Sequence, residues 1–304
     1  MLLVAGAGCR AQTVSRPPPS VLRLATAYTP LSEPLAAEYR RALPQLNIQP
    51  FASAGSPDVI RGIETNAADM GVASADDVYE AYWATTGVPS SNSHLRGVSL
   101  LQPLPAYLLV RAGSGITRIT DLHDRMVATG PLRTMSSKLA MLVVDAFGVH
   151  GVTLKPYSSR TTAAADLKSG ALAAIFLPGF LYPPDEVMTA VIREGAYIIP
   201  IEGPPVEKLR RENPFVRVVR VPRDIYAGQD RIFPTLGIDM VVVCREDLDE
   251  SLVYALTAQL FEAFPRLSGV EANLRFLNLD EAPATPIPLH AGAARYFRER
   301  ELSR

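Results

Sequence analysis

The sequence has few of the features that mark a protein that binds nucleic acid or spans a membrane. Thirty basic residues stand against thirty-one acidic ones, so the 304-residue chain has a net charge of -1. A chain without a basic excess lacks the electrostatic attraction that draws proteins to nucleic acid. Its apolar runs, such as "YLLVR", are far shorter than the roughly 20 residues that cross a bilayer. We therefore expect a soluble globular body that does not bind nucleic acid.

The motifs of common catalytic and metal sites are also missing. The sequence contains no phosphate-binding loop, no GxSxG elbow, no HExxH and no paired CxxC. The carboxylate pair Asp76–Asp77 begins a predicted helix, where the positive end of the helix dipole explains it. The histidines lack metal-ligand spacing and are expected to be surface or structural residues: His94, His123, His150 and His290. These absences predict a protein that is not an enzyme and has no cofactor and no metal.

The two cysteines stand in different settings. Cys244 ends the apolar run "GIDMVVVC" and is predicted to be a small buried hydrophobe. Cys9 follows "MLLVAGAG", which resembles the cleavage end of a bacterial lipoprotein signal but has no basic segment before it. Residues 10–20 are predicted to form a stiff polar tether, because consecutive prolines favour extended geometry. Either Cys9 is lipidated and anchors a periplasmic or cell-surface protein to the membrane, or it is an accidental cysteine in a frayed terminus (residues 1–20).

From Val21 onward, short β-type runs alternate with helical periods, which predicts an α/β fold with mainly parallel sheets covered by helices. The alternating series occurs twice, and a helical C-terminal segment follows it. Long strands expected at 104–113 and 237–245 are the natural places for the chain to cross between the two series, and two crossovers would make a hinge. The predicted lobes have these bounds: residues 21–108 plus 240–304 for the first, and residues 109–239 for the second.

A strand that runs into small residues and a helix start recurs along the chain, as in "SAGSPD" and "TGPLRTMSS". In the first of these, Ser56 is predicted to cap a helix that begins with Pro57. Strand C-termini and the helix N-termini that follow them share one edge of a parallel α/β sheet, where ligands bind. Backbone amides at these ends would surround a carboxylate, and Arg133 would add a charged fork. The amides expected to contribute belong to Gly55, Ser56, Thr134, Ser136 and Ser137.

Four segments occur in an order that resembles a known family. "GSPDVIRGIETNAADMGVASADDVYEAY", "ITDLHDRMVATG", "IYAGQDRIFPTLGIDMVVVCREDL" and "PLHAGAARYFRE" are similar to the TAXI family of TRAP-transporter solute-binding proteins, from about Leu24 to Glu299. The resemblance implies a two-lobed type II periplasmic-binding-protein fold, an anionic organic ligand and a TRAP-type membrane permease as partner. By position it also implies these ligand-binding residues: Tyr28, Ser53, Gly55, Ser56, Ser74, Asp76, Gly130, Thr134, Ser136, Gln229 and Thr235.

The sequence departs from the family most clearly in the second-lobe turn, where the family's "GSGT" reads "RTMS" here. Arg133 and Met135 thus replace two glycines and would narrow or recharge the pocket. Ser74 stands where the family often has glutamine, and Ala291 where it has proline. Binding at helix N-termini survives these changes because it uses backbone groups, whereas the identity of the ligand is not carried over.

Three functions stay open at this stage. The preferred one is a monomeric capture protein that binds a small carboxylate, such as a dicarboxylate or an acidic amino acid, for a permease. The second is an enzyme on the same fold, since fold does not fix function; it needs Asp76 or His290 beside another titratable group in the cleft. The third is a lipid-anchored sensor or partner-binding subunit that no longer transports.

Overall fold

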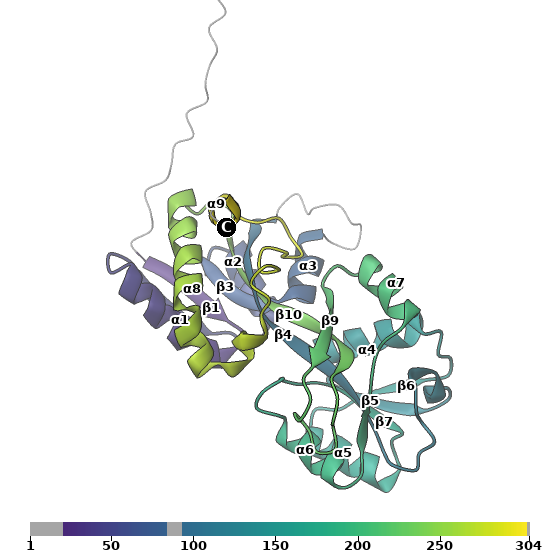
Figure 1. Cartoon of the computed structure of the whole chain (residues 1–304). Coiled ribbons are helices and arrows are strands. Elements are labelled where there is room, and N and C mark those ends of the chain that lie inside the picture. Colours follow the sequence, from purple (N-terminus) through teal and green to yellow (C-terminus); the bar gives the residue numbers. More distant parts are fainter. Residues whose placement is uncertain (1–20, 84–92, 303–304) are drawn as a thin grey trace, which may run out of the picture.

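The computed structural model describes residues 21–83 and 93–302 of the chain. In this part, ten strands form one mixed sheet, and the elements gather in two lobes that the long strands β4 (Leu95–Val110) and β10 (Phe233–Arg245) join (Figure 1). The strand order is β2-β1-β3-β10-β4-β7-β5-β6, with β8 beside β4 and β9 beside β10. The structure is therefore of the α/β class, as the alternating pattern predicted.

The first lobe contains the N-terminal α/β units together with the C-terminal helices. Strand β1 pairs in parallel with β2 and with β3. Helix α1 begins with Pro30 near its N-terminus, and α2 with Pro57, positions where the missing proline N–H costs nothing. The elements of this lobe are β1 (Val21–Thr26), α1 (Thr29–Ala42), β2 (Asn47–Ala52), α2 (Ser56–Glu64), β3 (Met70–Ser74), α3 (Ala75–Trp83), α8 (Glu250–Val270), the 3-10 helix η2 (Ala272–Phe276) and α9 (Ala291–Leu302).

The second lobe lies between the two long strands in the sequence. Strand β5 pairs in parallel with β6 and β7, whereas β7 and β8 run antiparallel to the second half of β4. Strand β9 pairs antiparallel with the first half of β10 and was not expected from the sequence. The elements are η1 (Ile119–Leu122), β5 (Met126–Thr129), α4 (Met135–Ala146), β6 (Thr153–Pro156), α5 (Arg160–Ser169), β7 (Ala174–Pro178), α6 (Glu186–Arg193), β8 (Tyr197–Ile199), α7 (Pro204–Glu212) and β9 (Val216–Val221).

The two long strands lie side by side and run antiparallel between the lobes. Strand β4 begins at Leu95, nine residues before the predicted start at 104, and β10 begins at Phe233 rather than at 237. Gly237 stands where the strands approach closely, because a Cβ there would come within 2.6 Å of the Leu104 carbonyl oxygen. The predicted crossing places thus fall on these strands, and the strands are longer than their most apolar stretches.

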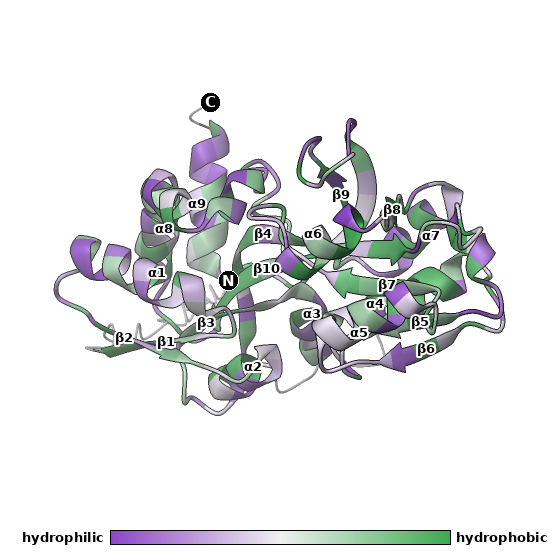
Figure 2. Cartoon of the chain, turned by 90° about the horizontal axis from the view of Figure 1, so that it is seen from below, coloured by the Kyte–Doolittle hydropathy of each residue, from purple (hydrophilic) through white to green (hydrophobic). Residues whose placement is uncertain are grey.

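Apolar packing connects the lobes on one face of the sheet and leaves them separate on the other. One core cluster joins α2 and α3 of the first lobe to α4 and α7 of the second, and the rings of Tyr79 and Phe215 are 5.3 Å apart in it. On the opposite face, α1, α8 and α9 cover one cluster, and α5 and α6 cover another. The central strands are accordingly hydrophobic, and outer helices such as α9 carry hydrophilic faces (Figure 2).

Cys244 is fully buried in the first-lobe core, as predicted, and burial raises the pKa of its thiol. Cys9 and the tether at 10–20 lie outside the described residues, so their predicted roles stay predictions. Within the described ranges, no helix combines the length and the apolar character that crossing a membrane requires.

Candidate functional site

Helix N-termini follow the strand ends at the edge where the two lobes face each other. Helices α1, α2 and α4 begin directly after β1, β2 and β5, and no side chain caps any of the three. By contrast, α5, α6 and α8 are capped by the side chains of Ser159, Asp185 and Asp249. The first amides of a helix have no partner within it, so α1, α2 and α4 present unsatisfied donors and the positive ends of their dipoles.

The prediction that Ser56 caps α2 is wrong. Gly55 is the N-cap residue, with an extended φ of 171°, and Ser56 is the first residue of the helix. The Ser56 hydroxyl instead accepts a hydrogen bond from the backbone amide of Ser74, at 2.9 Å, so it joins α2 to the end of β3. Ser53, just before this turn, donates its amide to the Thr26 carbonyl at 2.9 Å. The backbone donors at the start of α2 thus remain free of a side-chain cap.

A chain of polar contacts runs from this turn to the second lobe. The Ser74 hydroxyl donates to Asp76 Oδ1, and Asp76 is fully buried at the start of α3. Lys138 on α4 reaches across from the second lobe: its Nζ is 3.1 Å from Asp76 Oδ2, 2.7 Å from Asp77 Oδ1 and 2.9 Å from Glu80 Oε2. The structure therefore brings Ser56, Ser74 and Asp76 together and ties them to α4 through Lys138.

The charges around Lys138 fix its protonation state. Desolvation works to lower the pKa of Lys138, but the hydrogen bonds to Asp77 and Glu80 and the charge of Asp76 outweigh it, so the pKa is raised. Burial and the neighbouring Asp76 raise the pKa of Asp77, against the opposing effect of Lys138. Asp76 does lie beside another titratable group, as the enzyme hypothesis required, but Lys138 is held as a cation and offers no free amine at neutral pH.

The second-lobe turn between β5 and α4 is held by hydrogen bonds of its own serine and threonine hydroxyls. Gly130 donates its amide to the Ser136 hydroxyl at 3.0 Å, and that hydroxyl in turn donates to the Phe176 carbonyl at 2.8 Å. Thr134 is the N-cap of α4, but its hydroxyl donates to the Pro131 carbonyl at 2.7 Å rather than capping the helix. Arg133 has a left-handed φ of 65° and an exposed side chain. The Ser136 hydroxyl is thus occupied by backbone contacts, whereas the start of α4 has no side-chain cap and Arg133 is exposed.

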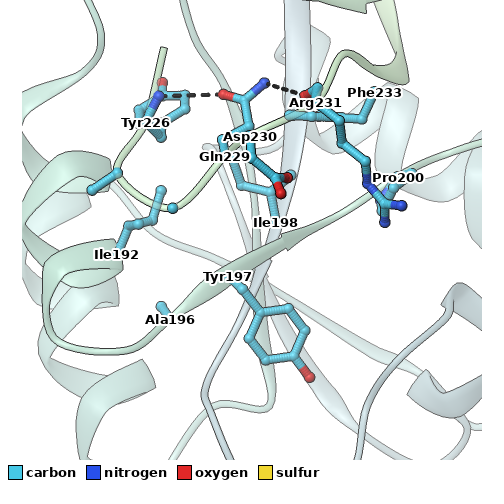
Figure 3. Close-up of a pocket in the computed structure, with 12 residues that line it drawn as sticks. Ile192, Ala196, Tyr197, Ile198, Pro200, Tyr226, Gln229, Asp230, Arg231 and Phe233 are labelled. Atoms are coloured by element: carbon cyan, nitrogen blue, oxygen red, sulfur yellow. Dashed lines mark hydrogen bonds between the residues drawn. The ribbon is translucent and has the colours of Figure 1, made fainter. Parts of the chain in front are cut away.

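Gln229 and Thr235 do not join this group of residues. The Gln229 carboxamide holds its own loop together: it accepts from the Tyr226 amide and donates to the Arg231 carbonyl (Figure 3). It also donates to the Pro222 carbonyl. That loop, β8 and Ile192 of α6 line a 430 Å³ pocket in the second lobe, and its lining combines apolar residues with Gln229, Asp230 and Arg231. Thr235 is fully buried, and its hydroxyl donates to the Ala106 carbonyl of β4. Both side chains are used by the fold.

Tyr28 lies at a second contact between the lobes. Its hydroxyl donates to Glu271 Oε2 at 2.5 Å, and its ring is 5.8 Å from that of Phe180 in the second lobe. Desolvation and the Glu271 hydrogen bond raise the pKa of Tyr28, while the Gln102 carboxamide opposes them. The Asn273 carboxamide accepts from two amides of the β7–α6 loop, at 2.9 and 3.0 Å. The lobes therefore meet at α3–α4 and again at the η2 segment.

Sequence reasoning missed the residues that form these two contacts. Lys138 is 61 residues from Asp77, and no local pattern connects them. The three carboxylates on one short helix, Asp76, Asp77 and Glu80, could have indicated a nearby cation, but the sequence analysis attributed Asp76 and Asp77 to the helix dipole alone. Nothing in the sequence singles out three other residues of the interlobe contact: Gln102, Glu271 and Asn273.

His290 is a structural residue, as predicted. Its Nε2 lies 3.2 and 3.1 Å from the carbonyls of Glu246 and Leu248, and its Nδ1 accepts from the Gly292 amide at 3.1 Å. Burial lowers the pKa of His290, so the ring is neutral at pH 7 and joins the end of β10 to the start of α9. Within the described part of the chain, no three His, Cys, Asp or Glu side chains are grouped to hold a metal ion.

A buried carboxylate lies in the hinge. Asp239 on β10 borders a 270 Å³ cavity formed with β9 and the segment after η2. Its side chain is 7% exposed, and its nearest cation is Arg217 at 3.6 Å, which also pairs with Glu281. Desolvation raises the pKa of Asp239 from 3.8 to about 6, although the charge of Arg217 works against this shift.

Asp239 should make the protein less stable as the pH rises from about 4 to 6. In that window the unfolded chain has lost the proton that the folded protein still holds, so unfolding becomes more favourable with pH. Asp239→Asn removes this effect and should gain about 3 kcal/mol relative to the wild type between pH 3.5 and 7.5. Urea unfolding of both proteins across this range measures it, and parallel stability curves would contradict the assignment.

Comparisons with known proteins agree with this architecture. A model of the NMT1-like family matches residues 24–300 of the chain. The structure is similar to XAC2383 from Xanthomonas citri bound to ATP, with a TM-score of 0.58 and 13% identity over 92% of this chain and 99% of that one.

Two further structures are those of sulfonate-binding proteins. The periplasmic aliphatic sulphonate binding protein SsuA from Escherichia coli has a TM-score of 0.53 and 14% identity, and the match covers 94% of this chain and 89% of that one. A putative sulfonate ABC transporter periplasmic sulfonate-binding protein SsuA from Methylobacillus flagellatus KT has a TM-score of 0.55 and 15% identity, over 88% and 75% of the two chains. At such low identity these likenesses establish the fold, which is that of periplasmic binding proteins.

Proposed function

The chain belongs to the NMT1-like family, and from this premise we propose that it is an extracytoplasmic solute-binding protein. It captures a small organic anion between its two lobes and delivers the anion to a membrane permease. A periplasmic or cell-surface location, with Cys9 as the lipid attachment site, is part of this proposal. The TAXI resemblance adds the finer suggestion that the permease is of the TRAP type.

The observation that carries the proposal is the set of uncapped helix N-termini. Helices α1, α2 and α4 all follow strands that end at the interlobe edge, two from the first lobe and one from the second. Converging helix N-termini bind anions through backbone amides, without any reactive side chain. The fourth helix start at this edge is different, because Asp76 and Asp77 already place carboxylates at the start of α3 and pair with Lys138. The anion therefore belongs at α1, α2 and α4 rather than at α3.

The ligand class is a carboxylate or a sulfonate. Both groups are planar or tetrahedral oxyanions that accept several backbone hydrogen bonds. The helix starts by themselves favour neither, and two of the structural relatives are described as sulfonate-binding proteins. Tyr28, Ser53, Gly55 and Gly130 stand at the turns that would surround such a group.

We propose that the two lobes close over the ligand by bending at β4 and β10. The rigid units are residues 21–108 with 240–304, and residues 109–239. Among the residues that the structure describes, both units consist mainly of short strands and helices, and the two long antiparallel strands β4 and β10 cross between them. Hinge closure around a ligand is a common motion for this arrangement.

Calorimetry with a panel of organic anions tests the proposal. The panel contains succinate, L-glutamate and ethanesulfonate, with the neutral diamide of succinate as the matched control ligand. We expect stoichiometric binding of at least one anion, and at 100 times its Kd about 2.7 kcal/mol of added stability in melting. An absence of binding across all organic anions would argue strongly against a capture function.

Arg133→Ala should weaken binding of the captured anion by roughly 1.5–3 kcal/mol, because the substitution removes a charge-assisted hydrogen bond. The residue stands one position before the N-cap of α4, and both arginine and alanine are strained at its φ of 65°. Calorimetric Kd values measure the effect, with Arg223→Ala as an exposed control arginine in the second lobe. An unchanged Kd removes Arg133 from the site.

A further inference from the structure

The second lobe contains a pocket that the proposed capture of an anion does not use. It has a volume of 430 Å³ and is lined by β8 and the end of α6 on one side and by the loop of residues 226–231 on the other (Figure 3). This volume is within the range of small-molecule sites. Of the residues predicted to bind the captured anion, only Gln229 lines the pocket. The pocket is therefore separate from the edge where the anion is expected to bind.

The loop that forms one wall of the pocket is held in shape by Gln229. Its carboxamide accepts from the Tyr226 amide at 3.2 Å and donates to the Pro222 and Arg231 carbonyls at 2.6 and 3.3 Å. Its backbone amide donates to the Tyr226 carbonyl at 3.1 Å, and its carbonyl accepts from the Asp224 amide at 2.9 Å. Because these bonds order the loop beforehand, a ligand that binds there loses less free energy in ordering it.

Apolar side chains form much of the remaining lining. Ile192, Ile198 and Phe233 line the pocket, and Phe233 is the start of β10. Tyr226 also lines it, but its hydroxyl is directed at Met188 Sδ, 3.7 Å away, so it is not available to a ligand. A ligand that fills this pocket buries apolar groups against these side chains, which favours binding.

Two opposite charges of the loop have no partner. Asp230 and Arg231 both line the pocket, and Figure 3 shows their side chains extending from the loop toward β8. Both residues are exposed, and neither side chain makes an ion pair or a hydrogen bond with another residue that the structure describes. By contrast, Arg223 and Asp224, just before this loop, pair with each other at 3.6 Å. The pocket thus presents one charged acceptor and one charged donor to a ligand.

The charge balance of the lining indicates the class of ligand. Asp230 and Arg231 are its charged residues, so the lining has no net charge. A simple anion at Arg231 would be repelled by the Asp230 carboxylate, and a simple cation at Asp230 would be repelled by the Arg231 guanidinium. A molecule that carries both an ammonium and a carboxylate group avoids both repulsions. An α-amino acid has these two groups on one carbon atom, and an apolar side chain suits the rest of the lining.

We propose that this pocket binds a free α-amino acid with an apolar side chain. Asp230 accepts hydrogen bonds from the ammonium group, Arg231 donates to the carboxylate, and the apolar side chain packs against Ile198 and Phe233. All of the lining belongs to the second lobe, so binding requires neither closure of the lobes nor the helix N-termini. The amino acid site is therefore independent of the proposed anion capture, and a failure of one leaves the other unaffected.

Calorimetry of the wild-type protein with L-phenylalanine and L-leucine tests the proposal. Each is compared with an analogue without the ammonium group, 3-phenylpropionate or 4-methylpentanoate, and with one without the carboxylate, 2-phenylethylamine or 3-methylbutylamine. We expect at least one amino acid to bind with a Kd below about 1 mM. It should bind about tenfold more tightly than either of its analogues, since a site built for both charges rejects a ligand that lacks one. Absence of amino acid binding, or equal affinity for an analogue, would overturn the proposal.

Methyl NMR spectra of isoleucine-labelled protein locate the bound amino acid. Ile192 and Ile198 line the pocket, whereas Ile48 and Ile63 are buried in the first lobe. We expect a saturating amino acid to shift the δ1-methyl signals of Ile192 and Ile198 and to leave those of Ile48 and Ile63 in place. Shifts confined to the first-lobe signals would show that the amino acid binds elsewhere, and the proposal would be wrong.

Substitutions of the two charges complete the test. Asp230→Asn and Arg231→Gln should each weaken amino acid binding about tenfold or more, because each removes a charge-assisted hydrogen bond. Their melting temperatures should stay close to that of the wild type, since both residues are exposed. Asp224→Asn and Arg223→Gln are the matched controls: both residues are exposed and lie outside the lining, so the affinity should stay within about twofold. Equal affinities in all four variants would contradict the assignment of Asp230 and Arg231.

Discussion

Lys138→Met should lower the free energy of unfolding by about 3 kcal/mol. Removing one partner of a buried ion pair leaves an uncompensated charge, and Asp76 is fully buried while Asp77 is close beside it. The value is at the lower end of the usual range because a fifth of the Lys138 side chain is exposed. Urea unfolding at pH 7 and low salt measures the change.

Lys168→Met provides the matched comparison. Lys168 pairs with Glu194 at 3.0 Å on the surface, with its side chain 67% exposed, so its loss should cost less than about 1 kcal/mol. If the two variants were equally stable, the three carboxylates around Lys138 would have to be solvated, and the contact between α3 and α4 would not hold the lobes together.

Asn273→Ala should favour the open form of the protein and weaken ligand binding at least tenfold. The Asn273 side chain joins the η2 segment to the second lobe: it accepts from the Leu181 and Tyr182 amides and donates to the Tyr182 carbonyl at 2.5 Å. Each bond contributes about 0.5–1.5 kcal/mol relative to hydrated groups, so their loss shifts closure by about 2–4 kcal/mol. Binding that requires the closed form weakens in proportion to the closed population.

Two measurements check this expectation. Small-angle scattering of the ligand-free variant should show a larger radius of gyration than the wild type, and calorimetry should show the weaker Kd. Asn278→Ala is the control, because Asn278 is exposed and its side chain accepts only from the nearby Asp280 amide. An unchanged radius together with an unchanged Kd would show that Asn273 does not control closure.

These two contacts lie on opposite sides of the hinge strands, and they differ in chemistry. The Lys138 contact is ionic and adjoins the apolar cluster shared by both lobes. The Asn273 contact consists of neutral hydrogen bonds beside Tyr28, where two separate apolar clusters face each other. A motion that keeps the first contact and breaks the second would open the molecule on the side of α1 and η2.

Much of the fold followed from local pattern. Alternating strands and helices predicted the α/β class, and the long apolar runs near Leu104 and Gly237 marked the strands that cross between the lobes. Strand β9 ("VRVVRV") was missed although it pairs with β10, the next strand in the chain, because the segment that joins them has an irregular pattern rich in proline and glycine. Ser56 was misplaced as a cap because the sequence signal for an N-terminus does not fix which residue is the first in the helix.

The candidate site, like the fold, was predicted from the sequence only in part. The helix starts at Gly55 and Thr134 could be read from the sequence, because proline, serine and glycine signal them locally. Their side chains could not be assigned: the hydroxyls of Ser136 and Thr235, both predicted to bind ligand, are used for backbone contacts of the fold. A serine or threonine near a turn satisfies whichever backbone group lies closest, and only the packed structure shows which one that is.

The sequence by itself determined the element types, the buried strands and the helix starts that present free amides, because these depend on neighbours a few residues apart. The tertiary structure decided which charges and amides meet across the lobes: Lys138 with Asp76, and Asn273 with the β7–α6 loop. These contacts between the lobes depend on the path of the two long strands, β4 and β10, that join them. The physical reason is that electrostatic and hydrogen-bond energies follow distance in space, which the order of residues along a chain does not give.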